Sequence, residues 1–318
     1  MTHKAYKQTM VFMKNKREKL KKQTCIQIFA IMGLVWMILF CFIPMVFNVI
    51  AFMDYDILHP FWESDWVGLE HFVDFFTNRD FAMVMKNTFA IGILKLFIGF
   101  PVPILFALML NEVSSNSFKR IAQTITYLPH FISWVIVGGM MVSMLSDSGV
   151  FNDILIWLGV LEEPIYFLAE PDCFWGIVTI SEIWKETGWQ AIIYLAAIAG
   201  ISPELYEAAT VDGASRFKRI WHVTLPGILP TVVILFILTA GKLMESNFNQ
   251  IMVLRNQLNY ETSTTLDIHV FQYGVQRYQQ SYATAVGLFN SVVSLLLVVL
   301  SNFVSRKLTG TGIMGDER

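Results

Sequence analysis

The sequence predicts an all-α integral membrane protein with six transmembrane helices. Of its 318 residues, 55% are hydrophobic and only 15% are charged, and the apolar residues gather into long runs separated by polar stretches. This composition is typical of a polytopic membrane protein. Lys and Arg are concentrated in alternate polar stretches, which indicates how the helices are oriented. The net charge of −2 gives no sign of nucleic-acid binding.

The first predicted helix follows a basic N-terminal segment, residues 1–25. Residues 1–24 contain eight Lys or Arg residues and one acid, so we expect this segment to be cytoplasmic. Residues 26–53 carry no charge. At about 1.5 Å per residue they are more than long enough to cross a ~30 Å hydrocarbon core. The run is too long for a signal peptide and no small-residue cleavage site follows it, so it is predicted to be a permanent span.

The second and third helices are predicted at 84–110 and 121–145. The stretch before them, 54–83, contains seven acids and one Arg and is placed outside. The connection 111–120 is short and ends with two basic residues, which places it in the cytoplasm. Prolines predict a kink in the second helix and an irregular third helix: Pro101 and Pro103 in the former, and Pro129 in the latter.

The last three helices are predicted at 174–200, 226–245 and 283–305. The stretch 146–173 before them contains six acids and no Lys or Arg and is placed outside, as is the polar stretch 246–282. The fourth helix is unusual because charged residues lie inside it, namely Glu182, Lys185 and Glu186.

The distribution of basic residues tests this topology. The proposed cytoplasmic segments contain 16 of the 23 Lys and Arg residues, whereas the proposed external segments contain three. Cytoplasmic loops are the ones that accumulate Lys and Arg. We therefore expect one membrane domain, residues 26–305, with a cytoplasmic tail at 306–318 and both termini in the cytoplasm.

The segment 201–226 between the fourth and fifth helices is predicted to be a docking loop. Ser202 is suited to cap a short helix and Pro203 to its first position, while Glu207 adds negative charge near the positive end of the helix dipole. Gly213 can take a positive φ where the helix stops. Small and basic residues complete the segment, the former allowing close approach of another protein and the latter indicating the cytoplasmic side: Ala208, Ala209, Arg216, Lys218 and Arg219.

This segment resembles the EAA loop of ABC importer permeases. Glu207-Ala208-Ala209 is followed by Asp212-Gly213-Ala214. Nine residues separate Gly213 from an aliphatic residue, Val223, which is followed by one further residue and Leu225-Pro226. Residues 127–134, 181–189 and 281–289 are in addition similar to carbohydrate-importer permeases of the LplB-like branch. The resemblance implies a type I ABC importer permease fold and uptake of oligosaccharides or polysaccharide fragments across a bacterial cytoplasmic membrane. It also identifies the ATPase-coupling residues: Glu207, Ala208, Ala209, Asp212, Gly213, Ala214, Leu225 and Pro226.

The resemblance further implies the partners of the chain. A second homologous permease subunit should complete a heterodimer, two cytoplasmic ABC ATPase subunits should bind the EAA loops, and an extracytoplasmic solute-binding protein should deliver the sugar. The chain has no G-x-x-x-x-G-K-[ST] phosphate cradle, so we expect no cofactor on it and ATP with Mg on the ATPase subunits. By analogy with related permeases, part of the external stretch 246–282, around 254–269, is expected to contact the binding protein; the alternative is an ordinary solvated loop.

Charged and aromatic residues of the fourth helix are candidates for the substrate pathway. Intramembrane charges normally face a pathway or a partner rather than lipid, although a buried ion pair that fixes helix packing is an alternative. Aromatic rings can stack on sugars, but most of them in membrane proteins face lipid or the interface. The candidates are Lys95, Glu182, Trp184, Lys185, Glu186, Trp189 and Tyr194.

Other classes of function are less well supported. The chain lacks the H-E-x-x-H and G-x-S-x-G motifs, so it is not expected to be an enzyme. Three scattered cysteines form neither a disulfide framework nor a metal site. His130 and His222 are interpreted as hydrogen-bonding residues near the cytoplasmic ends of helices. An ion-coupled secondary transporter using the intramembrane Glu and Lys residues remains the alternative function.

Overall fold

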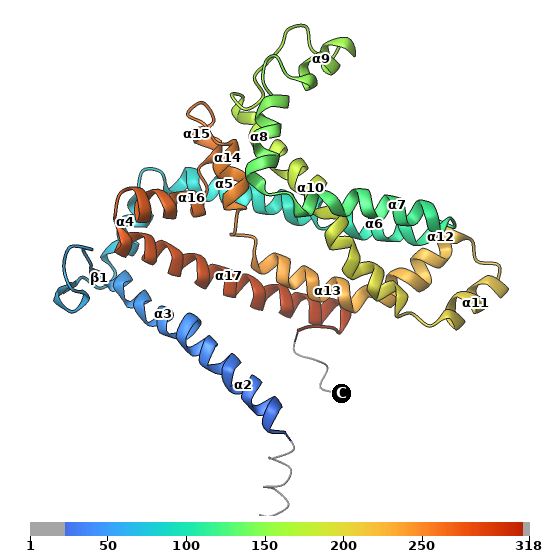
Figure 1. Ribbon diagram of the computed structural model, residues 1–318, viewed down its shortest axis with the longest axis horizontal. Coiled ribbons are helices and arrows are strands. Elements are labelled where there is room, and N and C mark those ends of the chain that lie inside the picture. Colours follow the sequence, from blue (N-terminus) through green and yellow to red (C-terminus); the bar gives the residue numbers. More distant parts are fainter. Residues whose placement is uncertain (1–22, 314–318) are drawn as a thin grey trace, which may run out of the picture.

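The computed structural model describes residues 23–313, and they are predominantly helical (Figure 1). The predictions for residues 1–22 and 314–318 lie outside the described residues. Four helices are long and apolar enough to cross a membrane: Ile26–Phe52, Phe81–Glu112, Arg216–Gly241 and Gln280–Thr309. Two further pairs of helices satisfy the same test only as bent pairs, so the described part of the chain offers four to six spans.

The first span diverges from the rest of the molecule (Figure 1). It consists of α2 (Thr24–Met37), η1 (Ile38–Phe42), α3 (Ile43–Val46) and η2 (Phe47–Phe52). Its most apolar window is 0% buried within the chain. The predicted helix at 26–53 is therefore present, but only its outer end at η2 packs on α17 (Gln280–Thr309).

The second span is a helix with one wide turn. α5 (Phe81–Leu94) passes into η4 (Lys95–Gly99), a single π turn, and then into α6 (Pro101–Glu112). The π turn lies directly before Pro101, whose ring prevents a regular helical hydrogen bond. The irregularity predicted from the prolines is thus located at Lys95.

The third predicted span is broken. α7 (Asn116–Tyr127) and η5 (Leu128–Phe131) are separated from α8 (Trp134–Met144) by a bend of 98°. The irregularity predicted at Pro129 is therefore present, as a sharp bend between two helices. At the break, Ile132 and Ser133 have extended backbones, and the Ser133 hydroxyl caps α8 by accepting from the backbone N–H of Ile136.

The fourth and fifth spans enclose the EAA segment. α10 (Pro171–Ala199) is followed, after a bend of 72°, by α11 (Pro203–Val211). The next helix runs through α12 (Arg216–Arg219), η6 (Ile220–Thr224) and α13 (Leu225–Gly241). The fifth helix thus begins at Arg216 rather than at residue 226, because the π turn η6 carries the helix through to Leu225.

The connections at the other end of the bundle hold shorter elements. β1 (Met53–Asp54) pairs antiparallel with β2 (Asp65–Trp66), with η3 (Phe61–Glu63) between them. The remaining elements are α4 (Glu70–Thr77), α9 (Val150–Trp157), α14 (Phe248–Leu254), α15 (Tyr260–Ser263), α16 (Leu266–Phe271) and η7 (Gln272–Gln276).

The stretch 246–282 is folded into the body rather than solvated. Ile251, Leu254 and Ile268 belong to one buried cluster with residues of α5 and α10. Its polar residues are also interior, since Asn259, Ser263, Thr264 and Thr265 are fully buried. Between residues 254 and 269 only Gln257, Leu258 and Glu261 are exposed, which leaves little surface there for the expected contact with a binding protein.

Candidate translocation cavity and coupling segment

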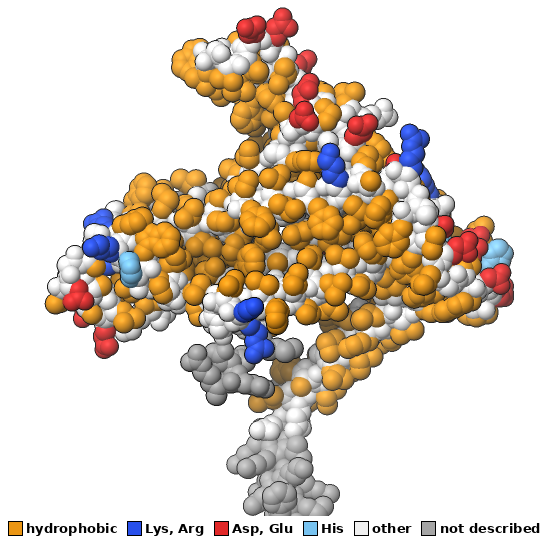
Figure 2. Space-filling model, turned by 180° about the vertical axis from the view of Figure 1, so that it is seen from behind, with side chains coloured by type: hydrophobic (Ala, Val, Ile, Leu, Met, Phe, Trp, Pro, Cys, Tyr) orange, Lys and Arg blue, Asp and Glu red, His pale blue; other side chains and the backbone are white. Residues whose placement is uncertain are grey.

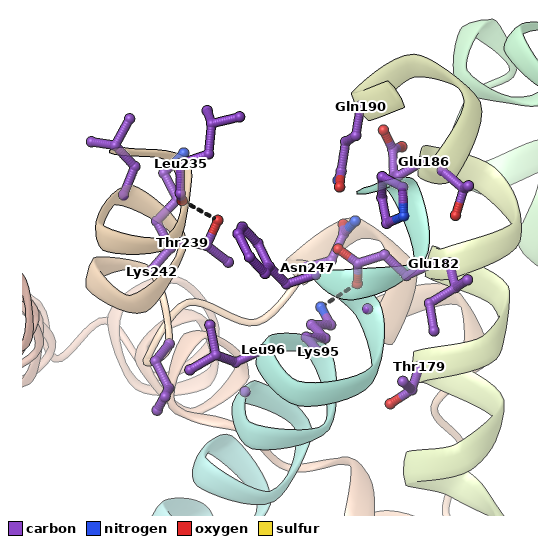
Figure 3. A pocket seen from close by; sticks show the side chains of 18 of the residues that line it. Lys95, Leu96, Thr179, Glu182, Glu186, Gln190, Leu235, Thr239, Lys242 and Asn247 are labelled. Atoms are coloured by element: carbon purple, nitrogen blue, oxygen red, sulfur yellow. Dashed lines mark hydrogen bonds and ion pairs between the residues drawn. The ribbon is translucent and has the colours of Figure 1, made fainter. Parts of the chain in front are cut away.

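A cavity of 560 Å³ lies between the membrane helices α5–η4–α6, α10 and α13. Its wall is partly apolar, with Leu96, Leu235 and Tyr194, and partly polar, with Thr179, Gln190 and Asn247 (Figure 3). Polar side chains among membrane helices are costly in lipid and are normally directed toward a pathway or a partner. The cavity is therefore the candidate site for a polar solute.

An ion pair crosses the cavity. The Lys95 ammonium contacts the Glu182 carboxylate, so the second span is joined to α10 (Figure 3). Both side chains keep some exposure, 17% for Lys95 and 24% for Glu182. Lys95 is the first residue of the π turn η4. These two charges offer a hydrogen-bond donor and an acceptor to a solute in the cavity.

Glu186 also lines the cavity, and its carboxylate is contacted by two basic side chains that do not line it. Its carboxylate lies 2.7 Å from His130 Nδ1 and 3.1 Å from Lys185 Nζ. Lys185 in turn donates to the backbone carbonyl of His130 at 2.8 Å and lies 5.4 Å from the centre of the Trp134 ring. The ammonium group of Lys185 does not reach the cavity, because it is directed at the break between α7 and α8.

The aromatic candidates have three different environments. Tyr194 is buried and lines the cavity. Trp189, also on α10, stacks on the His130 ring, with centroids 4.4 Å apart and planes within 1°. Trp184 is 53% exposed and Trp189 43% exposed, and neither lines the cavity within this chain.

His130 makes more contacts in the structure than its position in the sequence indicated. It sits at the α7–α8 break, where it contacts Glu186, Lys185 and Trp189 together. The signal available in the sequence was Pro129, which marks an irregular backbone inside an apolar run. A polar ring directly after such a proline is placed to meet the charges of a neighbouring helix.

The EAA segment forms a short helix that is fixed to the helix following it. The Tyr206 hydroxyl of α11 lies 3.0 Å from Thr224 Oγ1 of η6, and Arg219 of α12 donates to Thr210 Oγ1 at 3.2 Å. Gly213 has a φ of +71°, the conformation predicted for it. The Ser202 side chain makes no capping hydrogen bond, so the predicted cap is wrong and only its carbonyl serves the first turn.

The surface of this segment is open. Val211 is 88% exposed and Leu205 54% exposed, so apolar side chains face outward at this end of the bundle. The residues predicted to couple to an ATPase differ in exposure: Glu207, Ala208, Asp212 and Gly213 are exposed, Ala209 and Ala214 are partly buried, and Leu225 and Pro226 begin α13.

Most of the membrane helices and the EAA segment match a known protein family. Residues 99–310, which include α10, the EAA segment and the last two spans, match the family described as "Binding-protein-dependent transport system inner membrane component". The chain belongs to this family of permeases. The predicted resemblance is therefore confirmed, and the protein is a multi-pass membrane permease of the ABC importer class.

Individual relatives of the permease cover nearly its whole length. It is 41% identical to the "Polygalacturonan/rhamnogalacturonan transport system permease protein YteP" of Bacillus subtilis (strain 168), over 96% of each chain. It is 40% identical to "Protein LplB" of the same organism, over 92% of each chain. A solved structure of a bacterial alginate ABC transporter in complex with an alginate pentasaccharide-bound periplasmic protein is 40% identical, with a TM-score of 0.84 over 93% of this chain and 99% of that one.

Family membership also bears on the alternative function. A secondary transporter would require its intramembrane charges to exchange ions without a binding protein. In this permease Glu182 and Glu186 are both engaged by basic side chains, and the family is one that depends on binding proteins. The ion-coupled alternative is therefore set aside.

Proposed function

We propose that this permease takes up oligosaccharides or polysaccharide fragments delivered by an extracytoplasmic solute-binding protein. The substrate class rests on the relatives, which include a polygalacturonan/rhamnogalacturonan permease and an alginate importer with its periplasmic protein. The observation that carries the proposal is the partly polar cavity between membrane helices, because sugars need hydrogen-bonding groups and apolar surface together.

The proposed topology has six spans in the bacterial cytoplasmic membrane, with both termini in the cytoplasm. It counts the bent pair α7–α8 as one span and α10 as another, with α11 in the cytoplasmic connection after α10. The basic segment 1–25, the membrane domain 26–305 and the tail 306–318 keep the limits inferred from the sequence. The uncovered first span supports assembly with a second homologous permease subunit, since apolar helices without internal neighbours need a partner or lipid.

The pathway is assigned to the cavity face of α10 and the helices opposite it. Lys95, Glu182, Glu186 and Tyr194 line this face directly. Trp184 and Trp189 lie on neighbouring exposed surface of α10, where a partner subunit would complete the pathway. Lys185 does not line the cavity, and its ammonium group donates to Glu186 and to the His130 carbonyl.

Coupling to ATP is assigned to α11 and its flanks. Two ABC ATPase subunits, which carry ATP and Mg, are proposed to bind the exposed surface around Glu207 and Val211. Since Tyr206 and Arg219 tie α11 to the helix that follows it, a movement of α11 would be passed to α13 and hence to the cavity. Alternating access then exposes the cavity to the outside and the cytoplasm in turn.

The proposal is tested by reconstituting the complete importer in proteoliposomes and measuring uptake of oligosaccharides from polygalacturonan and alginate. Uptake should require ATP and the loaded binding protein together. Glu182→Gln should lower uptake because the cavity loses one charged acceptor, whereas Glu63→Gln, on exposed external surface away from the cavity, serves as the control. Uptake driven by an ion gradient without ATP would contradict the proposal.

A further inference from the structure

We propose that an external knob, defined as residues 146–166 and built around α9, is a docking element for the solute-binding protein. The inference rests on the proposed function, because it requires such a protein to meet this permease. The knob stands away from the membrane helices at the far end of α8 (Figure 1). None of its residues lines the cavity, so it has no role in the pathway described above.

The knob is rigid because one buried side chain clamps its two ends. Asn152 is only 1% exposed. Its amide group donates to the carbonyls of Ser146 at 2.7 Å and Ile165 at 2.8 Å, and its oxygen accepts from the backbone N–H of Ile165 at 2.9 Å. α9 is therefore presented in a fixed orientation, which lowers the entropic cost of binding a partner.

The base of the knob is anchored in the core. Leu145 and Leu168, on either side of the knob, both belong to the buried cluster shared with α10 and α14. The amide groups of Asn256 and Asn259 donate to the Leu168 carbonyl at 3.0 Å and 2.9 Å. A force applied to the knob is consequently passed to the body of the permease rather than absorbed by a loose loop.

One face of α9 is apolar and exposed, most of all at its C-terminal end. Phe151, Ile154, Trp157 and Leu158 follow helical spacing and lie on the side opposite Asn152. Trp157 is 83% exposed and Leu158 58% exposed. An exposed group of large apolar side chains marks an interaction surface, and Trp is among the residues that contribute most to binding energy.

The charges around this face identify the chemistry of the partner. The external stretch 146–173 contains six acids and no Lys or Arg. Figure 2 shows acidic side chains both at the tip of the knob and between the knob and the broad apolar surface of the helices. We therefore infer a protein surface with an apolar recess bordered by Lys or Arg residues, since such a surface complements the knob in shape and in charge.

Three observations favour the binding protein over other occupants. Anionic lipid would be repelled by the acids of the knob, whose own residues include no Lys or Arg, and the acidic and basic side chains seen at its base in Figure 2 separate the knob from the apolar surface that suits lipid. In the other long external stretch, 246–282, residues 254–269 expose only Gln257, Leu258 and Glu261, and the remaining exposed surface lies mainly at 275–279. In the alginate importer that is 40% identical to this permease, a periplasmic protein is bound in the solved complex.

The test uses the reconstituted importer in lipid nanodiscs and measures how much loaded binding protein gives half-maximal stimulation of ATP hydrolysis. Trp157→Ala should raise this concentration about tenfold or more, as expected for an interface Trp. Trp62→Ala is the matched control, because Trp62 is an external Trp that is 80% exposed and lies outside the knob. Its effect should stay within about twofold.

A second variant examines the charges and does not depend on the first. Glu162→Gln combined with Glu163→Gln should weaken the salt dependence of stimulation, because fewer acids face the basic rim of the partner. Recovery of the assembled complex is measured for every variant. If Trp157→Ala fails to assemble, the outcome for the Glu162/Glu163 variant decides.

Two results would overturn the inference while leaving the proposed function intact. One is normal stimulation with unchanged salt dependence in both knob variants. The other is a spin label on Trp157→Cys, in a background without the native cysteines, that contacts lipid-soluble oxygen more than aqueous reagents and so shows a membrane occupant. A wild-type importer that no binding protein stimulates would instead refute the proposed function itself.

Discussion

Replacement of Lys185 by Met is expected to destabilise the permease strongly. The ammonium group is nearly buried, with 5% of the side chain exposed. It donates to the His130 carbonyl at 2.8 Å and to Glu186 at 3.1 Å. Met fills a similar volume but supplies no donor, so the carbonyl at the α7–α8 break and one oxygen of Glu186 lose their partner.

The magnitude follows from what remains after the change. Removing one member of a buried ion pair costs about 3–5 kcal/mol, because the other charge is left uncompensated. His130 still contacts Glu186 at 2.7 Å, so part of the carboxylate stays satisfied. We therefore expect the lower end of that range, about 3 kcal/mol. Lys185→Met combined with Glu186→Gln should recover much of it, because no carboxylate is then left unpaired.

The assay compares Lys185→Met with Lys95→Met in thermal unfolding of the detergent-solubilised importer. Lys95 is also paired with a Glu inside the membrane domain but is 17% exposed at the cavity, so water can hydrate the carboxylate left behind. Lys95→Met should lower the midpoint much less and reduce uptake more. Equal loss of stability in the two variants, or a stable Lys185→Met protein, would refute the assignment of Lys185 to the structure and Lys95 to the pathway.

Three further predictions concern other parts of the permease. Gly188→Ala should prevent close packing of α10 on α7, because the added Cβ would lie 2.1 Å from the Thr126 carbonyl oxygen. Gly176→Ala on the same helix is the control, since its Cβ would meet no atom within 4 Å. The yield of folded protein in detergent should fall for Gly188→Ala and not for Gly176→Ala. Gly213→Val should lower transport per ATP hydrolysed, because φ is +71° there, while Gly213→Asn, which tolerates positive φ, should stay coupled. Burial lowers the pKa of His269 from 6.5 to about 4. The neutral ring therefore contributes stability that is complete above pH 6.5 and is lost as the pH falls toward 4, so the unfolding midpoint should drop across this range and His269→Gln should flatten the drop.

The membrane helices could be predicted from the sequence because their signal is local. The uncharged run 26–53 and the apolar runs before Arg306 need only length and hydropathy to be recognised. The break in the third span could not be predicted to the same degree. Pro129 indicates an irregular helix, but the 98° bend is fixed by α10, where Gly188 contacts Thr126 and Lys185 holds the His130 carbonyl.

A helical wheel also could not predict which neighbouring helix each charged side chain of α10 contacts. Glu182 and Lys185 are neighbours on one face of α10, yet Glu182 meets Lys95 across the cavity and Lys185 meets the α7–α8 break. The wheel gives the angle between two residues but not the helix that each of them faces. The outcome depends on tertiary packing.

For the stretch 246–282, composition did not predict which polar residues are exposed to solvent. Its polar residues suggested solvent, but Thr264 and Thr265 are buried because their polar groups are used inside the protein. Asn87 donates to the Thr264 carbonyl at 2.9 Å, and the Thr265 hydroxyl lies 2.7 Å from that of Ser246. Polarity in a sequence cannot distinguish a group hydrated by water from one hydrogen-bonded within a core.

The wide turn η4 makes the length of the second span as important as its residues. A π turn contains one residue more than an α turn, so everything after it is rotated by about 100° relative to an uninterrupted helix. Ile104, Ala107 and Leu108 of α6 are packed against α10 and α13 in that rotated register. Deleting a single residue from 95–99 would remove the extra residue and the wide turn together and so leave this packed face in place, whereas deleting one residue from α5 would rotate the face by about 100° away from α10 and α13. The effect of a change in length therefore depends on where in the second span the change falls.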